Sequence, residues 1–179
     1  MAQIHAGFDP TGGTTGQAVS GLAPRPETYR GSTLGIIDNT KPNAAVILSQ
    51  LGDILKERYG FKEVRSYVKN YFGTPMTPDL LKQVAEECDV VVTAVGDCGS
   101  CSAATVADGI MLEREGIPAV SICTDSFVAS AQAMAEVQGF PNYAFVTMAH
   151  PVASLDAEEL QERVTTALPE VTKILAVAN

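Results

Sequence analysis

The chain has 179 residues, of which 46% are hydrophobic and 18% charged, and this composition suits one compact domain with a large core. Its formal net charge of −9, without clustered Lys and Arg, argues against a nucleic-acid partner, because phosphate contacts need positive charge. The first residues lack the pattern of a signal peptide, and nowhere do about 18 uncharged apolar residues follow one another. We therefore expect a cytoplasmic protein with no membrane partner, whose four cysteines are reduced.

Residues 1–31 are rich in Gly, Thr and Pro and show neither a helical nor a strand period, which predicts an extended N-terminal arm. Such an arm either wraps over its own domain or reaches across a partner chain, and a partly disordered tail is the alternative. Residues 32–179 form the predicted α/β domain.

Within that domain, runs of β-branched residues alternate with stretches of helical period. The predicted strands are 32–37, 63–68, 90–95, 119–123 and 143–148. The predicted helices are 42–59, 78–87, 103–115, 129–137 and 155 to the C-terminus. The second strand alternates charged and apolar residues, as an edge strand does.

This strand and helix alternation predicts a single three-layer, doubly wound fold with a parallel five-stranded sheet and helices on both faces. We expect the flavodoxin-like strand order 2-1-3-4-5. In that order every strand-to-helix turn lies on one edge of the sheet, around the switch point between strands one and three. The polar residues gathered there are Asp38, Asn39, Lys41, Asp97, Cys98, Gly99, Ser100, Cys101, Thr124, Asp125, Ser126 and His150.

Two cysteines stand at the turn after the most apolar strand, in the run Gly96 to Cys101 (GDCGSC). The amino end of the following helix favours the thiolate form of Cys98, and Cys101 lies within reach of a reversible disulfide. A zinc site would need more ligands than this pair offers, so we expect no metal; inert turn cysteines are the other alternative. Cys88 and Cys123 border or end buried strands and are interpreted as core thiols.

The remaining polar residues each have a functional and a structural interpretation. His150, at a strand end, is a candidate general acid or base, or a packed edge residue. Asp97 would hold His150 or Lys41, or bond the amides of its own turn, and Asp125 has the same two roles. Thr124 and Ser126 are better explained as helix caps. Lys41 either binds a carboxylate or is solvated.

These motifs resemble those of the UGSC family, and the resemblance covers nearly the whole chain. The matching segments are DPTGG at 9–13, LAPRP at 22–26, LGIIDNTKPN at 34–43, ERYG at 57–60, GDCGSC at 96–101, LEREGIPAV at 112–120 and His150-Pro151. In some members selenocysteine occupies the position of Cys98, which implies nucleophilic or redox chemistry there. The cysteine turn is more distantly similar to the substrate-binding subunits of glycine and proline reductases and to the aspartate/glutamate racemase superfamily, which act on small carboxylates.

We therefore expect a thiol-dependent enzyme that needs no cofactor. The Cys98 thiolate would attack a small electrophilic, carboxylate-bearing substrate in reductive chemistry, with Cys101 as the resolving cysteine, Asp97 and His150 as catalytic partners and a thiol as reductant. Asp38, Asn39, Lys41, Gly99, Ser100, Thr124, Asp125 and Ser126 are the candidate substrate-binding residues. The alternatives are a non-redox lyase, isomerase or hydrolase, and a binding subunit of a larger complex. A homo- or hetero-oligomer is expected, because the racemases place a cysteine on each of two halves.

Overall fold

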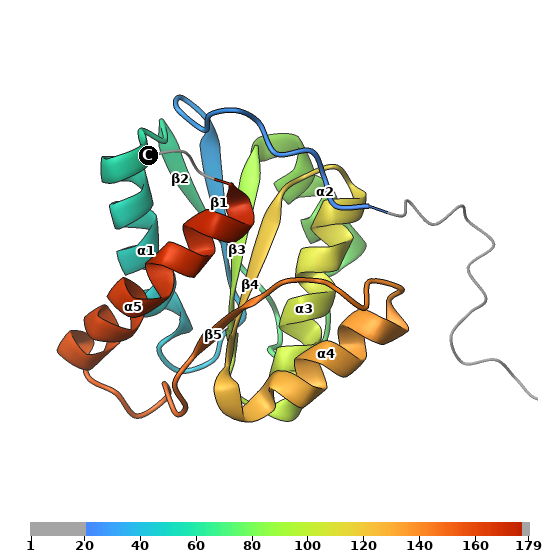
Figure 1. Ribbon diagram of the computed structural model, residues 1–179, viewed down its shortest axis with the longest axis vertical. Helices are drawn as coiled ribbons and strands as arrows, with labels where there is room; N and C mark the ends of the chain where they lie inside the picture. The colour runs from blue at the N-terminus through green and yellow to red at the C-terminus, as the bar shows by residue number, and fades with distance from the viewer. Residues whose placement is uncertain (1–20, 177–179) are drawn as a thin grey trace, which may run out of the picture.

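The computed structural model describes residues 21–176. Five parallel strands form one sheet with the order β2-β1-β3-β4-β5, as predicted (Figure 1). The strands are β1 (Thr33–Asp38), β2 (Glu63–Val68), β3 (Val90–Gly96), β4 (Ala119–Thr124) and β5 (Val146–Met148). The helices are α1 (Ala44–Tyr59), α2 (Pro78–Glu87), α3 (Gly99–Arg114), α4 (Val128–Val137) and α5 (Ala157–Leu175), with a short 3-10 helix η1 (Asp125–Phe127) before α4.

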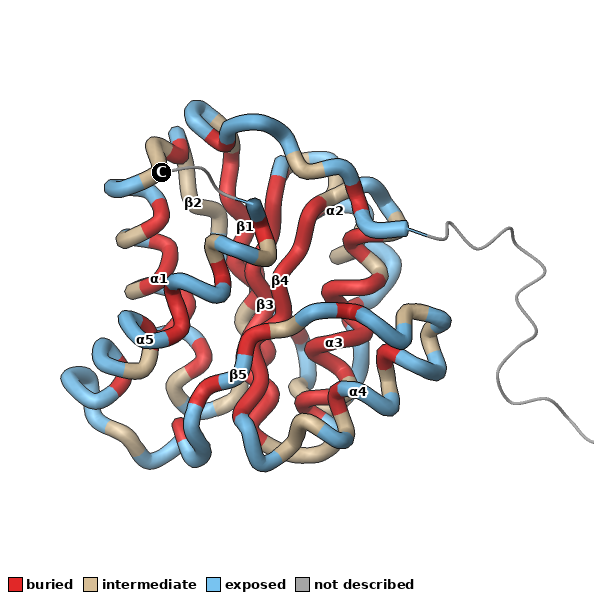
Figure 2. Tube along the Cα trace, in the orientation of Figure 1, coloured by how far each residue is buried: buried red, intermediate tan, exposed pale blue. Residues whose placement is uncertain are grey.

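Helices cover both faces of the sheet. On one face, α1 and α5 bury apolar side chains against the strands, and on the other face α2, α3 and α4 do so (Figure 1). Every residue of β3 is buried, whereas β2 is half-exposed along the sheet edge (Figure 2). This contrast explains why β3 is a continuous apolar run and β2 alternates. Among residues 21–176, no helix is both long and apolar enough to cross a membrane.

The ends of the helices follow from their local sequences. Gly60 adopts a left-handed conformation, φ 75°, and ends α1. Thr77 caps α2 and Pro78 occupies its first turn. Asp156 and Glu159 form a capping box at the start of α5.

Two predicted elements begin three or more residues away from their starts in the structure. Helix α3 begins at Gly99 and not at Ala103, because the Cys98 side chain caps it. Strand β5 covers only Val146–Met148, and Tyr143 lies before it. The Tyr143 hydroxyl lies 3.2 Å from Ser121 Oγ, so this residue packs between α3 and β4 and does not pair in the sheet.

The described part of the arm, from residue 21 onward, lies against its own domain along the edge where the strands begin. Arg25 forms a two-bonded ion pair with Glu113 at the end of α3, with both N···O distances 2.7 Å. The Tyr29 hydroxyl donates to the carbonyl of Leu175 at the end of α5, at 2.9 Å. Residues 1–20 of the predicted arm lie outside the described residues.

Candidate active site

The cysteine turn lies at the edge of the sheet where the strands end, at the bottom of Figure 1. Gly96 closes β3, and a Cβ on this residue would lie 2.7 Å from Cys123 Sγ and 2.6 Å from Ser102 Oγ. Only glycine therefore fits there, because β3 passes directly against the start of α3 and the end of β4. This close approach fixes the position of Cys98 two residues later.

Cys98 and Cys101 are joined by a disulfide, with their Cα atoms 5.2 Å apart. The sulfur of Cys98 also accepts a hydrogen bond from the Cys101 amide, at 3.2 Å, and so occupies the capping position of α3. Cys98 is partly exposed, whereas Cys101 is fully buried. The two cysteines are thus unequal, and of the pair only Cys98 is accessible to solvent. Ser100, which is exposed, places its hydroxyl 3.6 Å from the Cys98 sulfur.

The remaining thiols lie in the core. Burial raises the pKa of the Cys123 thiol to about 12, and burial likewise raises the pKa of Cys88. Neither residue supplies thiolate at neutral pH. Cys88 and Cys123 are free, whereas Cys98 and Cys101 are linked, which differs from the expectation of four reduced cysteines; the CxxC spacing brings these two sulfurs together.

His150 and Asp97 form a hydrogen-bonded pair beside the cysteine turn. Asp97 Oδ1 lies 2.8 Å from His150 Nδ1, and Asp97 Oδ2 accepts from the Ala153 amide at 3.3 Å. The Asp97 side chain is 4% exposed and that of His150 is 33% exposed. Because a carboxylate only accepts, Nδ1 is assigned the ring proton, which leaves Nε2 to exchange a proton.

Residues at the end of β4 orient this histidine. Thr124 is fully buried; its hydroxyl donates to the Gly96 carbonyl at 3.1 Å and lies 3.3 Å from His150 Nδ1. Asp125 Oδ1 accepts from the His150 amide at 3.1 Å. Ser126 is exposed and donates to Asp125 at 3.4 Å. Neither Thr124 nor Phe127 makes a side-chain cap, so the capping role expected of Thr124 is absent from η1.

In the turn after β1, two residues are hydrogen-bonded inside the protein and a third contributes a cation. Asn39 is fully buried and donates to the Val95 carbonyl at 2.9 Å and to Thr105 Oγ1 at 3.3 Å. Asp38 accepts from the Thr40 amide at 2.7 Å and so closes its own turn. The Lys41 ammonium lies 4.5 Å from the centre of the Phe72 ring, in a cation–π contact.

A buried ion pair between Lys69 and Asp108 was missed by the sequence analysis. Lys69 follows β2 directly and is 3% exposed, and Asp108 in the middle of α3 is fully buried. The Asp108 carboxylate also accepts from the Met76 amide at 2.6 Å. Burial raises the pKa of Asp108 to about 6, while Lys69 acts in the opposite direction. The available signal was an acidic residue in the middle of an Ala-rich, largely apolar stretch of helix.

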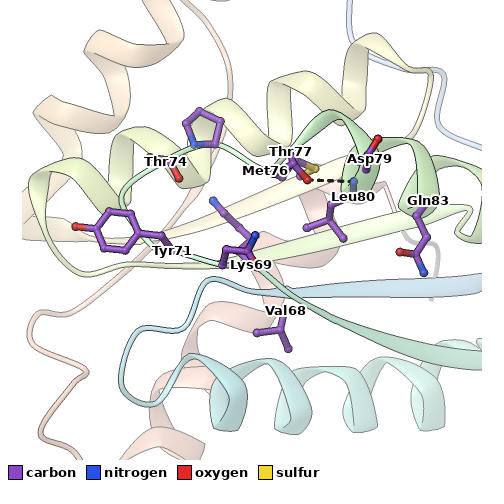
Figure 3. Close-up of a pocket in the computed structure, with 11 residues that line it drawn as sticks. Val68, Lys69, Tyr71, Thr74, Met76, Thr77, Asp79, Leu80 and Gln83 are labelled. Atoms are coloured by element: carbon purple, nitrogen blue, oxygen red, sulfur yellow. Dashed lines mark hydrogen bonds between the residues drawn. The ribbon is translucent and has the colours of Figure 1, made fainter.

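Lys69 and Met76 also line a pocket of about 260 Å³ between β2 and the start of α2. Tyr71, Thr74 and Leu80 border it, and Figure 3 shows their side chains around the opening. Phe72 and Gly73 do not line this pocket; they contact Lys41 and approach Ser100. The pocket and the cysteine turn therefore lie on different sides of the same loop.

Fold and site together define a class: flavodoxin-like α/β proteins with a cysteine pair at the start of the helix after the third strand. The sequence model of the UGSC family matches residues 6–177. The chain therefore belongs to the UGSC family.

Other comparisons add little. No curated protein matches the sequence. One solved structure that matches is described as the crystal structure of an ABC transporter permease from the Pseudomonas fluorescens group, with 16% sequence identity and a TM-score of 0.42. The alignment covers 79% of this chain and 32% of that chain, so this chain spans about a third of the permease.

Proposed function

We propose that the protein is a cytoplasmic thiol-dependent reductase in which Cys98 attacks a small electrophilic substrate and Cys101 resolves the adduct. The observation that carries this proposal is the unequal pair of linked cysteines: Cys98 is partly exposed at a helix start, and Cys101 is buried. The helix dipole and the Cys101 amide both stabilise negative charge on the Cys98 sulfur. A nucleophile facing solvent with its resolving partner behind it is the arrangement that thiol–disulfide exchange requires.

The reaction conserves atoms and electrons. The Cys98 thiolate attacks the electrophilic atom X of a substrate X–Y, forms a Cys98–X bond and releases Y with the bonding electron pair. The Cys101 thiolate then attacks Cys98, the Cys98–Cys101 disulfide forms, and X leaves with two electrons and takes up a proton. A thiol reductant of the cytoplasm returns the disulfide to two thiols, so the net reaction is a two-electron reduction of the substrate.

His150 is the proton carrier of the proposed cycle. Its Nδ1 is held by Asp97 at 2.8 Å, so the opposite ring nitrogen takes the proton of the Cys98 thiol and gives it to Y, and then takes the proton of the Cys101 thiol and gives it to X. Thr124 and Asp125 hold the ring and the backbone of His150 in this orientation.

A carboxylate on the substrate fits the charges near the cysteine turn. Lys41 forms no ion pair with a carboxylate within residues 21–176, and the start of α3 adds positive potential. Four other candidate residues already have hydrogen-bond partners within the protein, as described above: Asp38, Asn39, Thr124 and Asp125. In this proposal Lys41, Gly99 and Ser100 therefore contact the substrate.

The test is alkylation of the reduced protein by iodoacetamide at pH 7, followed by peptide mass analysis. We expect label on Cys98 well before Cys88 and Cys123, because burial keeps both of those thiols protonated. Cys98→Ser should abolish fast labelling and substrate turnover. Equally fast labelling of the Cys98→Ser protein would refute the proposal.

The variant Cys101→Ser separates reductive from non-redox chemistry. In the reductase, the adduct on Cys98 persists in this variant, and intact mass shows one substrate-derived addition per chain. Full multiple turnover by Cys101→Ser without any reductant would instead indicate a cysteine-dependent lyase, isomerase or hydrolase, a reaction that the His150–Asp97 pair also suits.

A further inference from the structure

The loop between β2 and α2, residues 69–77, forms a wall beside the cysteine turn. A Cβ on Gly73 would lie 3.4 Å from the hydroxyl oxygen of Ser100, and that hydroxyl lies 3.6 Å from the Cys98 sulfur. The neighbouring Phe72 ring supports the ammonium of Lys41. This loop therefore lies close to Ser100, two residues after the nucleophile, and contacts the cation assigned to the substrate.

One buried carboxylate holds both ends of this loop. Asp108 pairs with Lys69 at the start of the loop and accepts from the Met76 amide near its end, at 2.6 Å. Both charged side chains are at most 2% exposed. Removal of either charge would leave the other buried and unpaired, which is strongly unfavourable, so the pair holds the loop tightly to α3.

The same helix carries the cysteine pair. Cys101 lies in the first turn of α3, and Asp108 follows seven residues later, two helical turns along the same face. Between them, Thr105 accepts from Asn39 in the turn that leads to Lys41. The cysteine turn, the loop and the Lys41 turn are thus all attached to one face of one rigid element.

We infer that Lys69 and Asp108 are positioning residues for the Cys98 site, holding the 69–77 loop so that Phe72 keeps Lys41 where it favours anionic substrates. This inference rests on the proposed function, in which Cys98 is the nucleophile. Lys69 and Asp108 act through the loop and do not touch the substrate themselves. Through this loop, the preference of the Cys98 site for anionic substrates depends on the buried Lys69–Asp108 ion pair.

The experiment compares two alkylating probes of nearly equal size. Iodoacetate is anionic and iodoacetamide is neutral, and the thiolate displaces iodide from both. The rate with iodoacetate divided by the rate with iodoacetamide, both at Cys98 in the reduced protein, measures the preference for an anionic reagent. Changes in the fraction of thiolate affect both rates equally and cancel in this ratio. We expect Asp108→Asn to lower this ratio about threefold to fivefold, the effect of one nearby unit charge in a wet site, toward the ratio of Lys41→Met.

Glu113→Gln is a matched control. Glu113 is also a fully buried carboxylate of α3, pairs with Arg25 and accepts backbone amides, from Ala23 and Ala119, but it lies at the far end of the helix. It should lower the stability and leave the probe ratio unchanged. If Asp108→Asn does not fold, the double variant Lys69→Met/Asp108→Asn replaces it, because this variant leaves no unpaired buried charge, and the same criteria apply.

The outcomes distinguish this inference from the proposed function. A folded Asp108→Asn protein with the wild-type ratio overturns the inference and leaves Cys98 as the nucleophile. The inference is also overturned if Glu113→Gln lowers the probe ratio as much as Asp108→Asn does, or if Lys41→Met leaves the ratio at its wild-type value. Wild-type Cys98 that reacts no faster than Cys88 with either probe overturns the proposed function, and the inference with it.

Discussion

At the scale of single residues, the sulfur of Cys98 stands where helix caps usually carry an oxygen. Ser, Thr, Asp and Asn are the common caps because their oxygens accept free amides of the first turn. Here Cys98 accepts the amide of Cys101, the residue to which it is also bonded. The group that caps the start of the helix is therefore also the proposed nucleophile, and helix α3 gains its cap without a separate polar residue.

The His150–Asp97 pair leads to a prediction about turnover. His150→Gln should lower turnover by about a hundredfold or more, as expected when a positioned proton carrier is lost. Asp97→Asn should lower it through the same step, because the neutral amide has only one acceptor oxygen for the two groups, His150 Nδ1 and the Ala153 amide, that the carboxylate binds. The double variant should be no slower than His150→Gln, as measured by steady-state rates, since both changes act on one unit. Fully additive losses would show that Asp97 acts independently of His150.

The residues of the site differ in how far the sequence predicts them. Cys98 and Cys101 could be found because two glycines and a strand end mark their turn. Lys69 and Asp108 were not found, because they are 39 residues apart and no local pattern indicates that they meet. Asn39 and Thr124 were expected to face a ligand, and only the structure shows that both are fully buried.

At the scale of elements, α3 makes the contacts that assemble the site. Its first turn carries Cys101, its middle holds the loop through Asp108, and its end binds the arm through Glu113. All three of these residues are fully buried, although two are acidic. A helix buried on nearly all sides explains why α3 lacks the polar stripe of a surface helix.

Gly109 allows β4 and Tyr143 to approach this helix. A Cβ on Gly109 would overlap the hydroxyl of Tyr143 and that of Ser121. We expect Gly109→Ala to lower the free energy of unfolding by about 1–3 kcal/mol, as overpacked cores do, despite the better helix propensity of alanine. Urea denaturation provides the measurement. Adding Tyr143→Phe should recover part of the loss, and a more stable Gly109→Ala protein would contradict this account of the packing.

The elements themselves were largely predictable. The strong periods of α1 and α2 and the apolar run of β3 gave the correct element types with bounds close to those in the structure. The errors occurred where side chains override the local pattern. The Cys98 cap extends α3 toward its N-terminus, and the packing of Tyr143 against α3 shortens β5.

At the scale of the whole molecule, the arm segment from residue 21 ties α3 on one face of the sheet to α5 on the other. Arg25→Met should lower the free energy of unfolding by about 3 kcal/mol, because it leaves Glu113 buried without its cation. Arg30→Met in the same segment should cost about 0.5 kcal/mol or less, since Arg30 is exposed and has no ion pair with residues 21–176. Equal losses in the two variants, measured by urea denaturation, would show that the ion pair does not tie the arm down.

The topology was predictable because alternating strands and helices allow few arrangements once crossovers are right-handed. The path of the arm was not predictable in this way. Its attachments depend on Glu113 and Leu175, which are distant in sequence and have no local signature.

The described part of the arm and the candidate site lie at opposite edges of the sheet. The arm binds where the strands begin, whereas the cysteine turn, Lys41 and His150 lie where the strands end. Loops at that second edge can change in length and composition without loosening the contacts that hold α3 and α5 together.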